Sequence, residues 1–451
     1  MSDKSDIRRV SLASAIGSTL EWYDFFIFGA SAALVFNVLF FPSSDPLAGT
    51  IASLASFAVG FIARPLGGVL FGHFGDRIGR KAMLVLSLIM MGGVTFVIGL
   101  LPTYESIGIW APILLTALRL LQGLAVGGEW GGATLMVVEH APAKHRGFYG
   151  SWPQMGIPAA LILSTGVMAA VNAFTTKEEF LAWGWRIPFL LSAILVIVGY
   201  FIRKRVSESP SFNRLKSTKA QARLPIATIF KTQKKRVLLM VGSQAAENTS
   251  FYIAAVFSLV YLTQTLQIDR SVALRALMIA AAFTLIAQPL FGALSDRIGR
   301  KKVFMGGMIF LGLFAFPFFE MLNTRNEFII TVAMVLSLMI GQGSTQAIQP
   351  SLFGEQFPAA IRYSGVSVAY QLATVVWSGP TPVLAAMFVV WTGSYWPIAA
   401  YVLIAGLIST LCILPLREAA AVELEQIEHE ESDVAVAAQP AVSRAMGGQT
   451  A

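Results

Sequence analysis

The sequence predicts an all-α membrane protein with twelve transmembrane helices in two six-helix bundles. Of its 451 residues, 55% are hydrophobic and only 13% are charged, and the mean hydropathy is +0.67. A soluble domain has roughly 25% charged residues. Apolar stretches of about 20 residues, each long enough to cross about 30 Å of hydrocarbon as a helix, recur along the chain. One long polar connection, residues 203–236, divides them into two sets.

The expected spans are apolar runs bounded by charged residues, glycine or proline. They are 12–40, 48–72, 82–101, 109–138, 148–173 and 185–203, followed by 237–263, 273–294, 303–322, 328–354, 363–391 and 394–416. A membrane barrel would instead show short alternating segments. The expected domains are an N-terminal bundle (1–202), a cytoplasmic linker (203–236), a C-terminal bundle (237–417) and a partly disordered cytoplasmic tail (418–451).

Basic residues gather in alternate loops, which predicts the orientation of the chain. By the positive-inside rule, both termini and the 203–236 loop face the cytoplasm. The formal charge of +8 therefore reflects topology, and no nucleic-acid partner is expected. The N-terminus enters the first span without a small-residue cleavage site, so no removed signal peptide is expected. The lone Cys412 provides neither a disulfide nor a cysteine-based metal site.

Two loop sequences recur between the halves. GHFGDRIGRK (72–81), after the second span, returns as GALSDRIGRK (292–301) after the eighth. The Glu-to-Arg spacing of EHAPAKHRG (139–147) returns in EQFPAAIRY (355–363), and more weakly GSTLE (17–21) resembles GSQAAE (242–247). Matching positions on the same side of the membrane indicate two related bundles in the same orientation, a parallel repeat about the membrane normal.

These motifs resemble a known transporter family. The paired loops and RLLQGLAVGGEWGGA (119–133) are similar to the major facilitator superfamily. More narrowly, EWYDFFIFG (21–29), FIARPLGG (61–68), WGWRIPF (183–189) and ESPSF (208–212) resemble its metabolite:proton symporter branch. The resemblance covers residues 10–417. It implies a secondary transporter that works as a monomer and needs no cofactor.

Charged residues in the paired loops are expected to hold the cytoplasmic ends of the helices together. An acid at a helix end can pair with nearby bases or with the N-terminus of a neighbouring helix, and such contacts would break when this side opens. The expected gating residues are Asp76, Arg77, Arg80, Asp296, Arg297, Arg300, Glu129, Glu139, Arg146, Glu355 and Arg362. The alternative is charge that only sets topology, to which aspartate adds little.

Three ionisable residues are predicted to face a central cavity at the membrane midplane. Glu21 and Asp24 share one face of the first helix. They lie about ten residues into the span, which is about 15 Å deep at 1.5 Å per residue, and Arg119 reaches a similar depth from the outer side. Ionisable residues inside a membrane are typically functional. A permanent ion pair between Arg119 and a buried acid is the structural alternative.

Amide and phenol groups at the same depth predict a site for a polar small molecule, because such groups need partners in a low-dielectric interior. The expected substrate-binding residues are Tyr23, Arg119, Gln122, Gln154, Gln244, Glu247, Asn248, Tyr252, Gln342, Gln346, Tyr370 and Gln371. Gln342 and Gln346 could instead only join helices. Glu129 is expected to act in gating or helix packing. Arg64, in the inner half of the second span, could snorkel and is given at most a gating role.

Proton coupling is assigned to Asp24, Glu21 and Arg119. Burial and a neighbouring arginine act in opposite directions on the pKa of a carboxyl group. An acid whose access to Arg119 or substrate changes can therefore hold a proton in one state and release it in another. The resemblance implicates the acid of the E-W-x-D-F segment, which favours Asp24, while Glu21 stays open. The histidines after the second and fourth spans lie at helix ends, so a histidine relay is not expected.

The expected function is proton-coupled uptake of a small organic-acid anion across a bacterial inner membrane. Arg119 favours a carboxylate, which a planar guanidinium binds through two hydrogen bonds. The resemblance implies shikimate-like acids first, with dicarboxylates, tricarboxylates and proline or betaine as alternatives. An exporter of amphipathic compounds would need fewer amides, and a sensor would need an output domain. The sequence contains no Walker, zinc-protease or nucleophile-elbow motif, so an enzyme is not expected.

Overall fold

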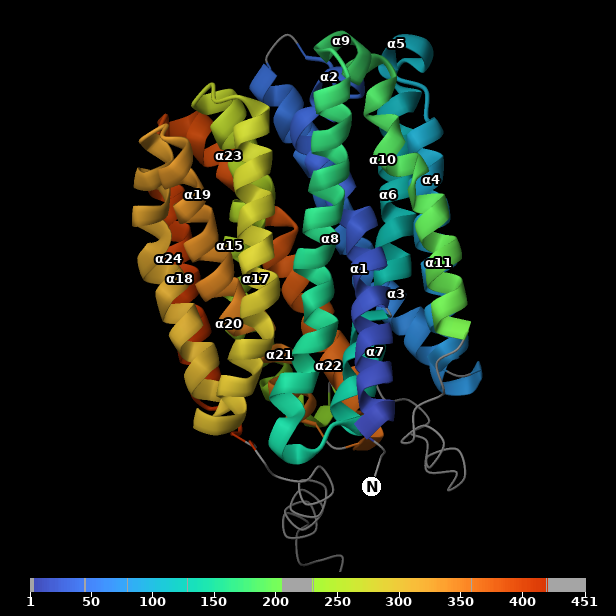
Figure 1. Cartoon of the computed structure of the whole chain (residues 1–451), viewed down its shortest axis with the longest axis vertical. Coiled ribbons are helices and arrows are strands. Elements are labelled where there is room, and N and C mark those ends of the chain that lie inside the picture. The colour runs from blue at the N-terminus through green and yellow to red at the C-terminus, as the bar shows by residue number, and fades with distance from the viewer. Residues whose placement is uncertain are drawn as a thin grey trace, which may run out of the picture.

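The computed structural model of the chain consists of helices and their connections, with no strand among the residues it describes (Figure 1). It describes residues 4–43, 46–78, 80–127, 129–204, 229, 231–357, 359–418 and 420, with the backbone alone at 4–6, 46–47, 72–78, 80–82, 84, 202–204 and 359–360. Most of the predicted linker and tail lies outside these residues.

In the described part of the chain, the helices form twelve membrane-length stretches. The first six are α1 (Lys4–Leu34) with α2 (Phe36–Leu39); α3 (Pro46–Ile78); α4 (Arg80–Leu100); α6 (Trp110–Val126) with α7 (Glu129–His140); α8 (Arg146–Phe174); and η2 (Phe180–Gly184) with α10 (Arg186–Leu190) and α11 (Ser192–Lys204). Short helices α5 (Tyr104–Ile107), η1 (Ala143–His145) and α9 (Lys177–Glu179) lie in connections.

The second set begins with α14 (Lys234–Ser243), α15 (Ala245–Tyr252), η3 (Ile253–Phe257), α16 (Ser258–Val260) and η4 (Tyr261–Thr265), which form one stretch. It continues with α17 (Arg270–Ile298); α18 (Arg300–Asn323); α19 (Glu327–Val335) with η5 (Leu336–Gln342), α20 (Gly343–Gln346) and α21 (Gln349–Gly354); α22 (Ala359–Ala373) with η6 (Thr374–Ser378) and α23 (Pro380–Thr392); and α24 (Trp396–Ile413).

Each predicted span coincides with one of these stretches, so the predicted all-α fold is confirmed. Within the described part of the chain, nine helices are long and apolar enough to cross a membrane by length and composition. The first, third and seventh stretches are not among the nine.

The two halves pack against each other along two seams. Within the first half, α1 packs on α8, α3 on α6 and α4 on α11; within the second, α18 packs on α24 and α17 on α19. Between the halves, α8 packs on α17, and α3 packs on α22 and α23. Figure 1 shows α8 and α17 side by side, with the two halves standing on either side of them.

Glycines bring α3 and α6 into backbone contact. A Cβ atom at Gly123 would lie 2.0 Å from the carbonyl oxygen of Gly60, and one at Gly127 would lie 2.0 Å from that of Arg64. No side chain fits at either position, as in other close helix crossings of membrane proteins. This contact sets the spacing between the polar residues of the two helices.

The described ends of the chain lie at one end of the molecule, together with the α7–α8 and α17–α18 connections (Figure 1). We call this the inner end, and it is the side predicted to face the cytoplasm. At the opposite end, the Asp269 side chain accepts a hydrogen bond from the Ser271 amide as the N-cap of α17. The Ser271 side chain and backbone lower the pKa of Asp269, which keeps it charged where a helix start favours an anion.

Candidate functional site

Arg119 lies on α6, fully buried among aromatic rings. Its Cζ atom is 4.2 Å from the ring centroid of Phe25 and 4.4 Å from that of Phe28. Gly60 on α3 provides the necessary room, because a Cβ there would lie 2.6 Å from Arg119 Nε. No carboxylate in the described part of the chain pairs with Arg119, and its Nη2 has no hydrogen-bond partner there. The alternative of a permanent ion pair is therefore wrong.

A chain of hydrogen bonds leads from Arg119 to Thr95, which lies near Asp24. Arg119 Nη1 donates to Gln122 Oε1 at 2.7 Å, and Gln122 Nε2 donates to Thr95 Oγ1 at 2.6 Å. The Thr95 hydroxyl donates its own proton to the Met91 carbonyl at 2.9 Å, and it lies close to the Asp24 carboxyl group. Asp24 is only 4% exposed, and its Oδ1 has no hydrogen-bond partner among the described residues. Glu21, one turn earlier on α1, is also buried.

Arg64 on α3 is a second buried guanidinium group close to the first. Its side chain is 0% exposed, and its Cζ lies 4.5 Å from the ring centroids of both Phe25 and Phe61. None of its three nitrogens has a hydrogen-bond partner in the described part of the chain. Arg64 does not snorkel, although its position in the sequence allowed this, because its side chain lies between aromatic rings of α1 and α3 and does not reach the surface.

In the second half, Glu247 on α15 is held by glutamines. Its Oε1 and Oε2 accept hydrogen bonds from the side-chain amides of Gln346 and Gln349, both at 3.0 Å. Gln342 Nε2 donates to the Glu247 carbonyl at 2.8 Å, and Gln288 Nε2 donates to Gln346 Oε1 at 3.2 Å. Both carboxylate oxygens of this acid therefore already have donors.

Aromatic and amide groups connect the halves beside this cage. Trp130 of α7 stacks on Tyr370 of α22, with ring centroids 3.8 Å apart and planes inclined by 6°. Trp130 Nε1 donates to Gln154 Oε1 at 3.1 Å, and Gln154 Nε2 donates to the Gln346 carbonyl at 3.0 Å. Gln371 adds a bond to the Gly127 carbonyl at 2.8 Å. These contacts cross the seam between the two bundles.

Other predicted binding residues have local partners. The Tyr23 hydroxyl donates to the Pro188 carbonyl at 2.8 Å, so it is directed into the N-terminal bundle. Asn248 donates to the Gln244 carbonyl and accepts from Ser378 at 2.7 Å. Tyr252 packs edge-on against Phe61 and reaches the aromatic group around the two arginines.

At the inner end, Asp296 of α17 caps a helix of the other half. Its Oδ1 and Oδ2 accept from the amides of Gly147 and Phe148, at 2.8 and 2.9 Å. These amides belong to the first turn of α8, whose N-cap residue His145 supplies no side-chain cap. The arrangement joins the two bundles through a charge placed at a helix start.

An ion-pair cluster lies next to this cap. Glu355 accepts from Arg300 at 2.8 Å and from Arg146 of the other half at 3.1 Å. A second pair across the halves joins Glu139 to Arg362 at 3.7 Å. At the inner end, the two bundles are thus joined by contacts that cross the seam.

Some expected gating residues lie elsewhere. Arg297 is exposed on α17, outside the cluster, and Glu129 accepts from the Ser87 hydroxyl at 3.0 Å within the N-terminal bundle. The side chains of Asp76, Arg77 and Arg80 are not among those the structure describes.

Three residues of these clusters were absent from the predicted site: Arg64, Gln288 and Gln349. A signal was present for Gln349, because Gln342, Gln346 and Gln349 follow the spacing of one helix face. For Arg64 and Gln288, the sequence indicates how deep in the membrane the residue lies but not toward which neighbouring helix its side chain points.

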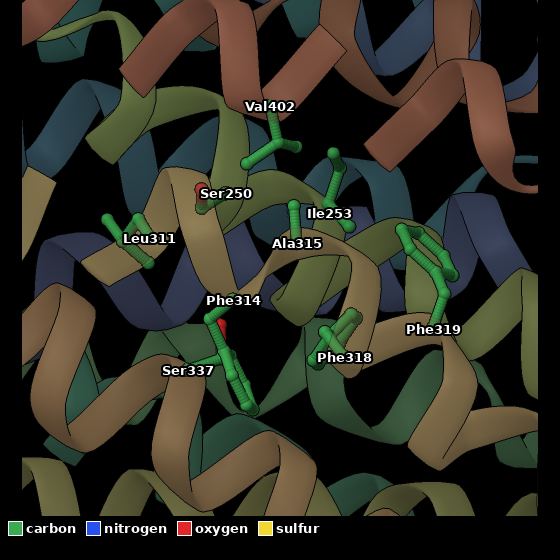
Figure 2. Close-up of a pocket in the computed structure, with 9 residues that line it drawn as sticks. All are labelled: Ser250, Ile253, Leu311, Phe314, Ala315, Phe318, Phe319, Ser337 and Val402. Carbon is green, nitrogen blue, oxygen red and sulfur yellow. The ribbon is translucent and has the colours of Figure 1, made fainter. Parts of the chain in front are cut away.

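A pocket in the C-terminal bundle lies apart from these groups. Figure 2 shows its lining of mainly apolar side chains from the seventh, ninth, tenth and twelfth stretches, with two hydroxyls, Ser250 and Ser337. None of the predicted binding residues lines it, and its composition does not suit an anion.

Comparison with known proteins gives consistent results for both halves. Residues 10–234 match the family model described as "Sugar (and other) transporter", and residues 243–446 match the model described as "Major Facilitator Superfamily". A shikimate transporter of Escherichia coli is 42% identical over 92% of this chain and 95% of its own length. A proline/betaine transporter of Salmonella typhimurium is 33% identical over 96% of this chain and 88% of its own length.

A solved structure shares the fold. The proton:xylose symporter bound to 6-bromo-6-deoxy-D-glucose superposes with a TM-score of 0.75 and covers 95% of this chain and 99% of its own, at 18% identity. At this identity, the likeness shows the fold alone.

Proposed function

The chain belongs to the major facilitator superfamily, and on this basis we propose that it is a proton-coupled symporter for a small organic-acid anion. As a member of that family it is a multi-pass membrane transporter and not an enzyme. The proposal places it in a bacterial inner membrane as a monomer, with bundles 1–202 and 237–417 moving relative to each other.

One observation carries this proposal: a buried acid and a buried base lie in the same bundle without neutralising each other. Asp24 has an oxygen without a hydrogen-bond partner, and Arg119 has a nitrogen without one, among the described residues. Buried charges are ordinarily paired. A proton on Asp24 and an anion at Arg119 would complete both groups, and these are the two species that a proton symporter of organic acids carries.

The Gln122–Thr95 contacts supply a physical link between the two events. An anion at Arg119 Nη2 would compete with Gln122 for the charge of the same guanidinium group, and Gln122 is bonded to Thr95, which lies near Asp24. In this proposal, Asp24 is the proton carrier in preference to Glu21. The arrangement makes proton loss sensitive to substrate occupancy.

The proposed substrate class rests on polar groups from both halves of the chain. Arg119 suits a carboxylate, and the amides around Glu247, Gln154 and Asn248 suit hydroxyl groups. A hydroxylated acid of the shikimate kind fits both, in line with the substrate in the name of one relative. Dicarboxylates, tricarboxylates and the zwitterions named for other relatives are the alternatives.

Alternating access would use the inner-end contacts as a gate. Asp296 on the α8 amides and Glu355 on Arg146 join the two bundles at this end. Release of substrate to the cytoplasm would require these contacts to break. The predicted orientation of both termini toward the cytoplasm belongs to this proposal.

The test is uptake by the purified full chain in proteoliposomes. With an inwardly directed proton gradient, labelled shikimate should accumulate above its external concentration, and a protonophore should reduce it to equilibrium. Accumulation that ignores the protonophore would overturn proton coupling. No uptake of any acid in a panel of shikimate, succinate and citrate would overturn the substrate class.

A further inference from the structure

Two buried guanidinium groups, not one, share the aromatic centre of the N-terminal bundle. We propose that Arg64 is a second anion-binding residue, which together with Arg119 holds the carboxylate of the substrate. This rests on the proposed function and narrows it to acids without a cationic group near the carboxylate.

The geometry places both guanidinium groups at one ring. Arg64 Cζ lies 4.5 Å and Arg119 Cζ 4.2 Å from the Phe25 centroid, so the two carbons are no further apart than the sum of these distances. Their helices are in backbone contact through Gly60 and Gly123, and Gly127 packs on the carbonyl of Arg64. The two positive charges are therefore held close by rigid elements of one bundle.

The aromatic rings leave the hydrogen-bonding edges of these groups unused. Phe25 and Phe61 stand close to Arg64 as in cation–π contacts, which need no acceptor for its N–H groups. Arg64 Nε, Nη1 and Nη2 and Arg119 Nη2 all lack a hydrogen-bond partner in the described part of the chain. A carboxylate approaching the edge of a guanidinium supplies the missing acceptors in the geometry that arginine binds best.

The same arrangement disfavours a zwitterion such as a betaine. Two like charges within one aromatic group already repel each other, and a third cation beside them would add to that repulsion. The rings that could face a quaternary ammonium are already in contact with the arginines. An anion without a nearby cation instead compensates both charges.

The experiment measures binding by the full chain in nanodiscs, without a proton gradient. Shikimate, its methyl ester and glycine betaine are titrated by calorimetry against the wild type, Arg64→Gln and the control Arg186→Gln. Arg186 donates to the carbonyls of Gly99 and Leu101 and does not contact the aromatic centre. The wild type should bind shikimate best. Arg64→Gln should weaken it about tenfold or more, as expected when charge-assisted hydrogen bonds are lost, and the control should not.

Thermal unfolding without ligand separates binding from a structural role. Because Arg64 is a buried charge with no hydrogen-bond partner among the described residues, Arg64→Gln should melt no lower than the wild type. If that variant does not fold, Arg64→Lys, which keeps the charge and loses the planar fork, should still bind shikimate more weakly.

Two results would overturn the inference, and only the second would also overturn the proposed function. Equal shikimate binding by the wild type and both Arg64 variants overturns the role of Arg64 and leaves the proposed function intact. A wild type that binds no acid, or that prefers glycine betaine, overturns the substrate class of the proposed function as well.

Discussion

The two bundles each bury an acid on their first helix, but they surround it differently. In the N-terminal bundle, Asp24 has an oxygen without a hydrogen-bond partner among the described residues, and Arg64 and Arg119 of the same bundle have nitrogens without one. In the C-terminal bundle, both oxygens of Glu247 accept amide hydrogen bonds. Protein hydrogen-bond donors therefore stabilise an ionised Glu247 in the C-terminal bundle more completely than an ionised Asp24 in the N-terminal bundle.

This difference indicates a division of labour between related halves. In the proposed function, the N-terminal bundle binds the proton and the anion, because its buried ionisable side chains have atoms without hydrogen-bond partners among the described residues. The C-terminal bundle has neutral donors and acceptors arranged around a satisfied acid, which suits recognition of hydroxyl groups. The predictions below test that division in order of decreasing effect.

The largest effect is expected from Asp24→Asn. An amide cannot take up and release the proton, so accumulation driven by a proton gradient should fall to equilibrium while exchange of substrate across the membrane continues. The matched change in the other half, Glu247→Gln, should retain accumulation. Uphill uptake by Asp24→Asn in proteoliposomes would remove Asp24 from the mechanism, and loss in both variants would remove the contrast between the halves.

Arg119→Lys should produce the next largest effect. Lysine keeps the charge and loses the planar fork, so binding of a carboxylate should weaken by about tenfold to a hundredfold, the range of one lost charge-assisted hydrogen bond or more. The measurement is the KM for shikimate uptake, with the amount of folded protein as the control. An unchanged KM would place the carboxylate elsewhere.

Glu247→Gln should act on stability more than on coupling. A glutamine has one acceptor oxygen, so either Gln346 or Gln349 loses its acceptor in a buried site, at a cost of about 1–3 kcal/mol. The melting temperature should fall, and the second change Gln349→Leu should recover part of it by removing the unsatisfied donor. A melting temperature unaffected by Glu247→Gln would show that the cage does not depend on the charge.

The smallest effect is expected from Trp130→Phe at the seam. The ring stack on Tyr370 is kept in part, while the bond from the indole N–H to Gln154 is lost, at about 1 kcal/mol. Because Gln154 also donates to the Gln346 carbonyl of the other bundle, loosening its side chain should raise the rate of substrate exchange slightly without altering proton coupling. A collapse of uptake instead would place Trp130 in the substrate site.

The fold could be predicted because its main signals are local. Twelve apolar runs bounded by charge mark the helices, and recurrence of the 72–81 loop at 292–301 marks the two halves. Several residues around Glu247 could also be predicted, since the depth of a residue along a membrane helix follows from counting residues. Counting residues placed Gln346 and Glu247 at the same depth in the membrane, and in the structure their side chains are hydrogen-bonded.

Direction around the helix could not be predicted in the same way. Arg64 is one turn from Gly60, and whether its side chain turns to the surface or to Phe25 depends on the packing of α3 on α6, which the glycines decide only in three dimensions. Likewise, the absence of an acid beside Arg119 among the described residues depends on how neighbouring helices are rotated. A single sequence contains no measure of that rotation.

The cap that Asp296 places on α8 has a consequence for measuring motion. The amides of Gly147 and Phe148 have this carboxylate from the other bundle as their acceptor. Each time the inner end separates, we expect both protons to meet water and exchange with deuterium. The rate of deuterium uptake at these two amides, followed by mass spectrometry in the native chain, would then report how readily the inner end opens.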